Sequence, residues 1–570
     1  MTRMTEGFDA PVDNAYFRPG VGDASAPAFS GTLRISASRM RTAPELLHAV
    51  IGGRDARFFP GITLSFLTVD DILVPTRRGE MVAESAPGPA PSYWDVIPQF
   101  GRVWREEGAD GWSRAAFPIM LVNDTENHAH QGLATFLYKD GVVGDLRFQF
   151  VQQTAPYLLK QHFVAWGVAS VTLVEPTLAD VESHRARARE ELAARLPAMP
   201  WSQLVSSGVA AGALGGFGGP VKRQWRVANA LVREGTLYYQ DVDTPYGPYP
   251  YPLEMRFGVR SVMKSVAAPL SLLRLAQIYG PTVLTLKIGD YVSGLDPKYN
   301  RIRFIDAANM ASGFGGTGTL QTNPNDINDG YLGGDYDAWY TAPSHDEKLA
   351  QIAKDLRPYP WDPGVVVRYR DQDFYLLGVA IDRFLKSVRG PQADAWNMLR
   401  DEVFTPIGIA QAPAIRTHET GGSPGITWFN AGYYPSLDDL AKIALLYQNE
   451  GQWGDRQILH RQLTRDLLAS HEALLKTGNA TRPTKVADED VGDTPLYKMG
   501  FHFTPYVGSS SGRRYYLPAM WGSGESEVVL YPNRVISIRI AKAAQLPDGE
   551  AATEGDTQAT AHAVDRLAPF

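Results

Sequence analysis

Strand-like segments occupy two separate stretches of this chain, with a long and mostly helical stretch inside the second. From about residue 58 to residue 175, apolar runs such as FFPGITLSFLTV and GDLRFQFVQQ are separated by turn residues, a pattern typical of a β-sandwich or barrel-like module. Later, QWRVANALVR and GTLYYQD precede the helical stretch, and YKMGFHFTPY, RRYYLPAMW, SEVVLYP and VISIRIAKA follow it. Strands on both sides of a helical insert predict one sheet that both ends of this region build together.

The length of the chain indicates more than one domain, because 570 residues exceed what a single hydrophobic core usually serves. A charged helical segment (178–196) is followed by a Gly- and Ala-rich stretch, SSGVAAGALGGFGGP (206–220), that is typical of a joint. We therefore predict a β-rich N-terminal accessory domain over 1–197. Residues 198–570 are predicted to form an α+β domain, an antiparallel sheet flanked by helices, with a helical insert at about 285–490.

Composition excludes several classes of function. The formal net charge is −7 and no long basic run occurs, which argues against nucleic acid or an anionic membrane as a partner. The chain has no cysteine, so thiol catalysis, thiolate metal sites and disulfides are excluded. The N-terminus lacks the apolar core of a secretory signal, and no uncharged apolar run reaches the length of about 18 residues that a membrane span needs. We expect a soluble, cytoplasmic protein.

Metal ligands do not form a convincing pattern. His128 and His130 would share one face of a strand, but no third ligand lies nearby in the sequence. The Asp-rich stretch TNPNDINDGYLGGDYDAWY (322–340) could suit calcium, but it departs from EF-hand spacing. We interpret it as an ordered loop at the rim of a cleft, and we expect no metal or cofactor.

One lysine lies within an otherwise apolar run, MRFGVRSVMKSVAAPLSLLRLAQIYG (255–280). Ser261 precedes Lys264 by three residues, a spacing that no other lysine of the chain has with a serine. In a helix both side chains would lie on one face, and the helix N-terminus would favour an anionic oxygen. Burial should lower the pKa of Lys264 toward a neutral amine that can accept the serine proton. The alternative is an ordinary lysine that extends its ammonium from an amphipathic helix to solvent.

Two other serines match the Gly-x-Ser-x-Gly pattern of a nucleophile elbow, Ser423 and Ser510. Pro424 follows Ser423 and has no N–H for an oxyanion hole, and Ser510 lies in a Ser/Gly turn between two strand-like runs. Both are interpreted as loops. Tyr369 follows a Pro-Gly turn and precedes the helical run DFYLLGVAID. It could lean into a cleft and relay protons, and the alternative is an ordinary half-buried aromatic residue.

Five segments, in order over residues 225–542, resemble the motifs of the serine β-lactamase-like superfamily. FGVRSVMKSV resembles its nucleophile box, IDAANMASGFGG its LLTHTSGL segment, and PGVVVRYRDQDFYLLG its PG…YSN…YxLLG box. The segment AGYYPSLDDLAKIALLYQNEGQWGDRQIL and the final YKMGFHF and MWGSGESEVVLYPNRVISIRI complete the series. The likeness is to the branch of class C β-lactamases, family VIII esterases and 6-aminohexanoate-dimer hydrolases. It implies a β-lactamase/transpeptidase-like domain with its active site between the sheet and a helical subdomain.

The resemblance also implies roles for individual residues. Ser261 corresponds to the acylated nucleophile, Lys264 to its general base and Tyr369 to the second proton carrier. The oxyanion hole would combine the N–H of Ser261 with one from the last strands, where this chain has Trp521, Gly522, Ser523 and Gly524.

The chain departs from the β-lactamase and transpeptidase pattern at two places. Asp371 stands where those members have Asn, and an ionised acid cannot donate a hydrogen bond as an amide does. Trp521-Gly-Ser-Gly524 stands where they have Lys-Thr-Gly, so the site lacks the cation that would hold a substrate carboxylate. A literal Lys476-Thr-Gly478 lies in a polar loop and is not taken for that motif.

We therefore expect a serine hydrolase that cleaves a small, partly apolar and neutral ester or amide through an acyl-enzyme, without a cofactor. Further substrate contacts are predicted from Arg370, Asp371, Trp428 and Tyr433. The N-terminal domain is expected to cover the cleft or to form a subunit contact, which would make the protein a homo-oligomer. The alternative function is a binding or scaffold protein that keeps the fold without turnover, which Asp371 and the missing cation favour.

Overall fold

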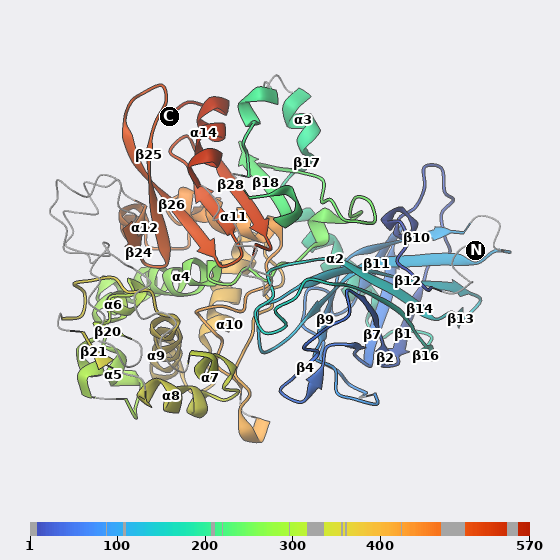
Figure 1. Ribbon diagram of the computed structural model, residues 1–570, viewed down its shortest axis with the longest axis horizontal. Coiled ribbons are helices and arrows are strands. Elements are labelled where there is room, and N and C mark those ends of the chain that lie inside the picture. Colours follow the sequence, from blue (N-terminus) through green and yellow to red (C-terminus); the bar gives the residue numbers. More distant parts are fainter. Residues whose placement is uncertain are drawn as a thin grey trace.

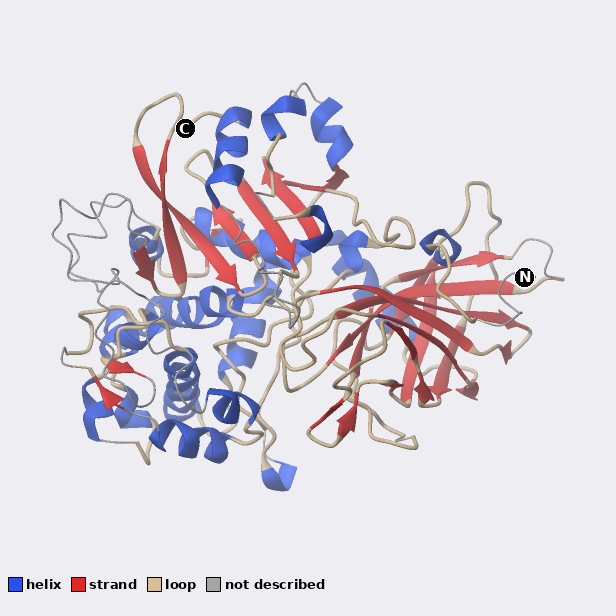
Figure 2. Cartoon of the chain, viewed as in Figure 1, coloured by secondary structure: helices blue, strands red, loops and turns tan. Residues whose placement is uncertain are grey.

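The computed structural model describes residues 8–86, 88–106, 110–206, 211–218, 221–295, 297–315, 336–354, 357–359, 362–422, 424–468, 496–543 and 557–570. Two large sheets lie on different sides of the molecule, and a group of helices lies below the second sheet (Figure 1, Figure 2). The first sheet is built from the blue and cyan part of the chain, and the second from the green and red parts (Figure 1).

The N-terminal part forms a twelve-stranded sheet with the order β16-β1-β7-β8-β10-β11-β12-β14-β15-β3, to which β13 and β9 add by pairing with β12 and β11. The neighbouring strands pair antiparallel. The short strands β2 and β6, and β4 and β5, form two further pairs. The bounds are β1 Ser30–Ile35, β2 Ser38–Arg39, β3 Arg41–Ala43, β4 Val50–Ile51, β5 Arg54–Asp55, β6 Phe58–Phe59, β7 Ile62–Val69, β8 Ile72–Pro75, β9 Asp95–Pro98, β10 Gly101–Arg105, β11 Ser113–Val122, β12 His130–Lys139, β13 Val142–Val143, β14 Leu146–Gln153, β15 Val164–Ala169 and β16 Val171–Glu175.

Strand β11 shows how this sheet joins the rest of the molecule. All ten of its residues are buried, and successive side chains of a strand point to opposite faces. Ala115, Phe117 and Ile119 belong to the core of the N-terminal part. Ala116 and Met120 belong to the large core that contains the helices and the second sheet. One face of β11 therefore closes the first core, and the other face packs on the second part of the chain.

The second sheet has eight strands in the order β17-β19-β18-β28-β27-β26-β25-β24. Strand β18, before the helical stretch, pairs antiparallel with β28, near the end of the chain. The prediction of one sheet built from both ends of this region is thereby confirmed. The bounds are β17 Ala198–Pro200, β18 Arg226–Arg233, β19 Thr236–Tyr239, β24 Leu496–Lys498, β25 Phe501–Val507, β26 Arg514–Gly522, β27 Ser526–Leu530 and β28 Ile536–Ala541.

The edge strand β17 departs from the antiparallel prediction, because it pairs parallel with β19. Between β17 and the β18–β19 hairpin the chain passes through α3 (Trp201–Ser206) and the Gly-rich joint. A connection of that length allows a crossover, which a parallel neighbour requires and a tight hairpin does not provide. The other neighbouring strands of this sheet pair antiparallel.

Helices cover both faces of the second sheet, as the alternation of its buried side chains requires. Val528 and Ile538 pack into the core that contains α4 (Val262–Tyr279) and α11 (Leu437–Gln448). Leu517 and Val529 pack in a separate cluster with α14 (Thr557–Leu567). The expected α+β architecture, an antiparallel sheet flanked by helices, is confirmed apart from the parallel edge strand.

The described part of the middle of the chain, where a helical insert is predicted at about 285–490, contains mainly helices and loops. Besides α11, its described α-helices are α5 Ile288–Tyr291, α6 Phe304–Ala308, α7 Tyr336–Thr341, α8 His345–Lys354, α9 Asp371–Arg389, α10 Ala395–Leu399 and α12 Arg461–Leu467. Two-residue strands, β20 Phe314–Gly315 with β21 Arg357–Pro358 and β22 Gln452–Trp453 with β23 Arg456–Gln457, form two small pairs. The charged segment predicted as helical at 178–196 forms α2 Val181–Ala193.

Helix α4 lies between the second sheet and the helical group (Figure 1). It packs against β26, β27, α9 and α10. Most of its side chains are buried on every side, which fits an apolar sequence without a polar face. Its N-terminus therefore lies inside the molecule, where α9 and β26 can bring other side chains to it.

The division of the chain at residue 197 remains a prediction. The strands separate into two sheets on either side of it. One apolar cluster, however, contains Phe17, Ile97 and Leu133 together with Val227 and Val262. The two parts therefore share a continuous core.

Candidate active site

Ser261 and Lys264 lie together at the start of α4. Ser261 is the N-cap residue and Lys264 lies in the first turn. The Nζ of Lys264 is 2.7 Å from the Oγ of Ser261, with the lysine donating the hydrogen bond. A second hydrogen bond of 2.8 Å runs from the same Nζ to the backbone oxygen of Asn430. Both residues are buried, with 7% of Ser261 and 1% of Lys264 exposed, so the lysine does not extend to solvent.

The charge of Lys264 differs from the sequence prediction. Burial disfavours the ammonium, as expected, but the carboxylate of Asp371 and the hydroxyl of Tyr369 outweigh burial, and the pKa of Lys264 is raised above its ordinary value. The Nζ of Lys264 lies 2.7 Å from Oδ1 of Asp371 in a buried ion pair. The prediction of a lowered pKa and a neutral resting amine is therefore wrong. That prediction took account of burial alone, whereas the fold also brings the carboxylate of Asp371 to the amine of Lys264.

Tyr369 completes a group of three with Ser261 and Lys264. It precedes α9, its side chain is buried, and the Nζ of Lys264 lies 5.0 Å from the centre of its ring. Burial raises the pKa of Tyr369, and its interactions with Lys264 and Ser261 lower it, so that the net shift is upward. The tyrosine is therefore a protonated phenol beside the serine and the lysine.

Asp371 and Arg370 are neighbours in sequence but point to different partners. Asp371 begins α9 and pairs with Lys264, and its Oδ2 accepts a 2.6 Å hydrogen bond from the hydroxyl of Tyr336. Arg370 pairs with Asp373 at 3.2 Å. The structure thus brings Asp371 to the predicted site and turns the guanidinium of Arg370 toward a buried carboxylate.

The end of β26 lies directly against the turn that carries Ser261. A Cβ at Gly522 would lie 2.1 Å from the backbone oxygen of Val259 and 3.2 Å from the backbone nitrogen of Val262. Only a glycine allows the strand to come this close. Trp521 precedes this contact, and Ser523 and Gly524 follow it in the turn to β27. The segment predicted for the oxyanion hole therefore lies beside Ser261.

His502 is a further residue of this site that the sequence analysis missed. It lies on β25, and its ring is 5.7 Å from that of Trp521, 5.8 Å from that of Tyr369 and 5.0 Å from that of Tyr497. Burial and the charge of Lys264 lower the pKa of His502 to about 4. It is a neutral imidazole at physiological pH. Its only sequence signal was a polar residue within the strand-like run YKMGFHF.

Trp428 and Tyr433, predicted as substrate contacts, pack against other side chains in the structure. The ring of Tyr433 is fully buried and packs on Trp396 and Phe404, so it belongs to the core. Trp428 is 3% exposed, and the ammonium of Lys348 lies 4.0 Å from its ring centre. Trp428 also lines a separate pocket with Arg54, Asp124, Thr125, Thr341, Ala342, Pro343 and His418. For neither residue is a contact with Ser261, Lys264 or Tyr369 found in the described part of the chain.

The competing serine and metal motifs fall mostly outside the described residues. This applies to Ser423, to Asp326, Asp329 and Asp335 of the Asp-rich stretch, and to Lys476, Thr477 and Gly478. Ser510 lies in a turn between β25 and β26 with no helix directly after it, as predicted for a loop. Among the residues that the structure describes, no group of three or more potential ligands is arranged to hold a metal ion. No helix in the described ranges is long and apolar enough to cross a membrane.

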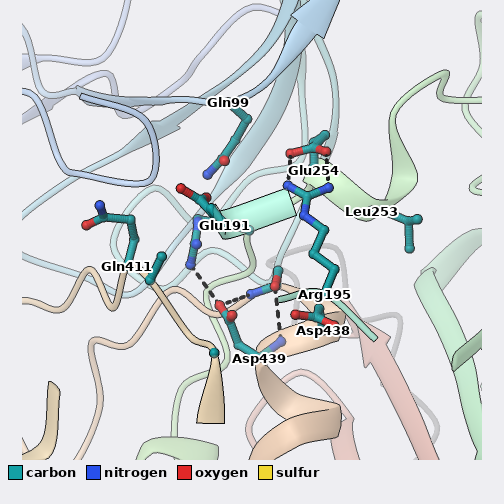
Figure 3. A pocket seen from close by; sticks show the side chains of 12 residues that line it. Gln99, Glu191, Arg195, Leu253, Glu254, Gln411, Asp438 and Asp439 are labelled. Carbon is teal, nitrogen blue, oxygen red and sulfur yellow. Dashed lines mark hydrogen bonds and ion pairs between the residues drawn. The ribbon is translucent and has the colours of Figure 1, made fainter. Parts of the chain in front are cut away.

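A polar pocket lies at the junction of the two parts, away from the predicted residues (Figure 3). Its charged side chains are paired: Arg195 with Glu254 at 2.5 Å, and Arg256 with Asp439 at 2.9 Å. Asp438, also in its wall, pairs with Lys442 at 2.6 Å. The first two pairs join the segment after α2 to the segment before α4, and that segment to α11. The pocket contains none of the predicted site residues, and we interpret it as a structural junction.

No family model and no curated protein matches the sequence. Solved structures that match include a Bacillus anthracis protein assigned as a 6-aminohexanoate-dimer hydrolase, with 15% identity, 60% of this chain and 78% of that chain covered, and a TM-score of 0.41. An octameric penicillin-binding protein homologue of Pyrococcus abyssi is 16% identical over 55% of this chain and 69% of its own, with a TM-score of 0.38. A class C β-lactamase in complex with cefoxitin is 12% identical, with 60% of this chain and 91% of that chain covered and a TM-score of 0.36. Two of these names, 6-aminohexanoate-dimer hydrolase and class C β-lactamase, are also names of proteins that the sequence motifs resemble.

Proposed function

We propose that this protein is a serine hydrolase that cleaves an ester or amide bond through an acyl-enzyme on Ser261. The observation that supports it most is the 2.7 Å hydrogen bond between Lys264 and Ser261 in a buried site that also contains Tyr369. A serine hydroxyl becomes a useful nucleophile only beside a group that can take its proton. Three proton-carrying side chains within one buried group satisfy that need.

The proton path of the proposed acylation includes Asp371. An ammonium has no lone pair, so Lys264 must first give a proton to the carboxylate of Asp371, 2.7 Å away. The amine then accepts the proton of Ser261 as Oγ bonds to the substrate carbonyl carbon. The ammonium is restored, and Asp371 carries the extra proton. In this scheme Asp371 holds a proton only until the leaving group has taken one up from Tyr369, and it is not a substrate ligand.

The later steps use Tyr369 and the end of β26. As the tetrahedral intermediate collapses, the leaving group needs a proton, and the buried phenol of Tyr369 can supply it and be reprotonated through Lys264. The N–H of Ser261 and an N–H from Trp521–Gly524 would stabilise the oxyanion. Water then attacks the acyl-enzyme, and the protons move between the same side chains in the reverse direction. No metal or cofactor has a role in these steps.

A substrate without negative charge fits the proposed site. In the part of the chain that the structure describes, the basic side chains beside it already have partners: Lys264 has Asp371, and Arg370 has Asp373. The Nη2 of Arg260, the residue before Ser261, donates a 2.5 Å hydrogen bond to the backbone oxygen of Ala155. A carboxylate on the substrate would have to displace one of these partners. Trp521, His502 and Tyr369 instead offer aromatic faces, which suit an apolar acyl or alcohol group.

A fluorophosphonate tests this proposal, because it forms a stable adduct only with an activated serine. We expect a single adduct per chain by intact-mass analysis, and peptide mapping should place it on Ser261. The alternative is a scaffold protein in which the Lys264–Asp371 pair is purely structural. An unmodified protein after prolonged treatment would favour that alternative and contradict the enzyme.

The division of the chain into domains 1–197 and 198–570, and a homo-oligomer formed through the N-terminal part, remain proposals as well. The two separate sheets support the first. Size-exclusion chromatography with light scattering tests the second, and a monomeric mass across the working concentration range would contradict it.

A further inference from the structure

The residue immediately before the proposed nucleophile has an unusual backbone conformation. Arg260 has φ = +52°, in the left-handed region that residues with a side chain rarely adopt. This conformation turns the chain into α4, so that Ser261 faces Lys264 instead of continuing the preceding segment. An arginine has no local interaction that favours a positive φ, so contacts with other parts of the molecule must hold the backbone of Arg260 in this conformation.

Asn127, from the N-terminal part, holds this backbone. It lies in the loop between β11 and β12, 133 residues before Arg260. Its side-chain oxygen accepts a 2.6 Å hydrogen bond from the backbone N–H of Arg260. Its amide nitrogen donates a 3.0 Å hydrogen bond to the backbone oxygen of Tyr433. Asn127 is fully buried, so water does not offer a replacement for either bond.

The side chain of Arg260 is held by the same part of the chain. Its Nη2 donates a 2.5 Å hydrogen bond to the backbone oxygen of Ala155 and lies 3.5 Å from a carboxylate oxygen of Glu126. Its guanidinium lies 5.7 Å from the centre of the Tyr157 ring. Backbone and side chain of Arg260 are thus both bound by the loops 123–128 and 154–158 of the N-terminal part.

Two close approaches show that these loops press on both sides of the serine. A Cβ at Gly258 would lie 2.2 Å from the backbone oxygen of Asn127. A Cβ at Gly524, in the turn predicted to form part of the oxyanion hole, would lie 2.6 Å from the Cβ of Ala155. The N-terminal loops therefore contact the turn before Ser261 and the turn beside it.

From these contacts we infer that the N-terminal part completes the active site, and that Asn127 is a positioning residue for Ser261. Asn127 does not touch the reacting atoms; it holds Arg260 in the left-handed conformation that aims the serine at Lys264. The inference rests on the proposed role of Ser261 as nucleophile. It gives the N-terminal part a task that differs from covering the cleft or forming a subunit contact.

The test is a cycle of substitutions at positions 127 and 260. Asn127→Ala should lower kcat for a p-nitrophenyl ester by about 10- to 100-fold, the scale expected when a reacting group is slightly misplaced, with KM nearly unchanged. Arg260→Ala and Arg260→Gly both delete the side chain, but only glycine adopts a positive φ without strain. In the Asn127→Ala background, the kcat of the Arg260→Gly variant should therefore be at least about fivefold higher than the kcat of the Arg260→Ala variant.

Gln131→Ala is the matched control. Gln131 lies on β12 and donates a 2.9 Å hydrogen bond to the backbone oxygen of Arg256, so it joins the same two parts without touching Arg260. We expect Gln131→Ala to lower the Tm about as much as Asn127→Ala does, but to leave kcat within about twofold of the wild type. Equal losses of kcat in the two variants, or no advantage of glycine over alanine at 260, would overturn the inference.

The same cycle read in Tm separates this inference from the proposed function. If the wild type forms no adduct at Ser261, the proposed function fails, but thermal unfolding still reports on the coupling of the two positions. The Tm advantage of Arg260→Gly over Arg260→Ala should be smaller in the Asn127→Ala background than in the wild type, because alanine can leave the left-handed conformation once Asn127 no longer holds it. An equal advantage in both backgrounds would mean that Asn127 does not hold this backbone.

Discussion

Replacing Asp371 with Asn should change both the stability and the pH dependence of the protein. The substitution keeps the size of the side chain and removes its charge, so it leaves Lys264 as a buried ammonium without a carboxylate. At 2.7 Å the attraction between Lys264 and Asp371 amounts to about 6 kcal/mol, if the effective dielectric constant is about 20. The loss cannot reach that value, because the lysine can release its proton instead.

The energy of that proton release sets an upper limit on the loss. Deprotonating a lysine with an ordinary pKa of 10.5 at pH 7 costs about 5 kcal/mol, at about 1.4 kcal/mol per pH unit. Removing one partner of a buried ion pair usually costs about 3–5 kcal/mol. We therefore expect the free energy of unfolding of Asp371→Asn to be lower by about 3–5 kcal/mol at pH 7, measured by urea titration.

The pKa of Lys264 determines how the stability difference between the wild type and Asp371→Asn changes with pH. In the wild type the pKa of Lys264 is raised, so the contribution of the pair is complete below the unfolded pKa and is lost only as the pH rises through the folded pKa. In Asp371→Asn burial should lower the pKa of Lys264, and the unfolded chain then binds more protons than the folded one. The deficit of the variant should shrink as the pH rises from 7 toward 10, by up to about 1.4 kcal/mol per unit.

Asp373→Asn is the matched control on the same helix. Its partner Arg370 is also buried, at 3.2 Å, but a guanidinium keeps its proton over this pH range. Asp373→Asn should therefore lose stability by an amount that stays constant between pH 7 and pH 10. In the ester assay Asp371→Asn should gain a limb on which the rate rises with pH, which the wild type lacks. A loss below about 1 kcal/mol at pH 7, or the same loss at pH 7 and pH 9.5, would refute the assignment of a charged Lys264–Asp371 pair.

Three further predictions concern the site. Ser261→Ala should abolish ester turnover and the fluorophosphonate adduct while the Tm changes little, and an adduct that persists on another serine would contradict the assignment. Tyr369→Phe should slow turnover by about 100-fold, the scale of a lost proton carrier, and a near-normal rate would remove Tyr369 from the mechanism. Short-chain p-nitrophenyl esters and neutral aryl amides should be cleaved far better than nitrocefin or benzylpenicillin, because the basic side chains around the site are already paired; efficient penicillin hydrolysis would show that a cation reaches the substrate.

The sequence could predict those parts of the site that depend on local spacing. Ser261 and Lys264 lie three residues apart on one helix, so their contact follows from helix geometry alone. The sheet built from both ends of the second region followed from the order of strands and helices. The place of Trp521–Gly524 beside Ser261 was implied by the resemblance to the superfamily motif, and the close approach at Gly522 was not predicted.

The remaining features depend on tertiary contacts that no local pattern records. Whether Lys264 is charged depends on Asp371, which lies on another helix 107 residues later in the sequence. Burial alone gave the wrong direction for that pKa. His502 and Asn127 are single polar residues in a strand and a loop, and nothing near them in the sequence marks them. Their importance comes from facing a helix N-terminus that the fold brings to them.

The pairing of β18 with β28 has a consequence for how the protein is made. Arg233 ends the first of these strands and Ile536 begins the second, 303 residues later. At about 5–20 residues per second, a ribosome needs roughly 15–60 s to synthesise the segment between them. During that interval the edge of β18 that later pairs with β28 has no partner strand, although its other edge can already pair with β19. Asp371 and the end of β26 also emerge after Ser261, so the proposed nucleophile should gain its full set of neighbours only once synthesis is nearly complete.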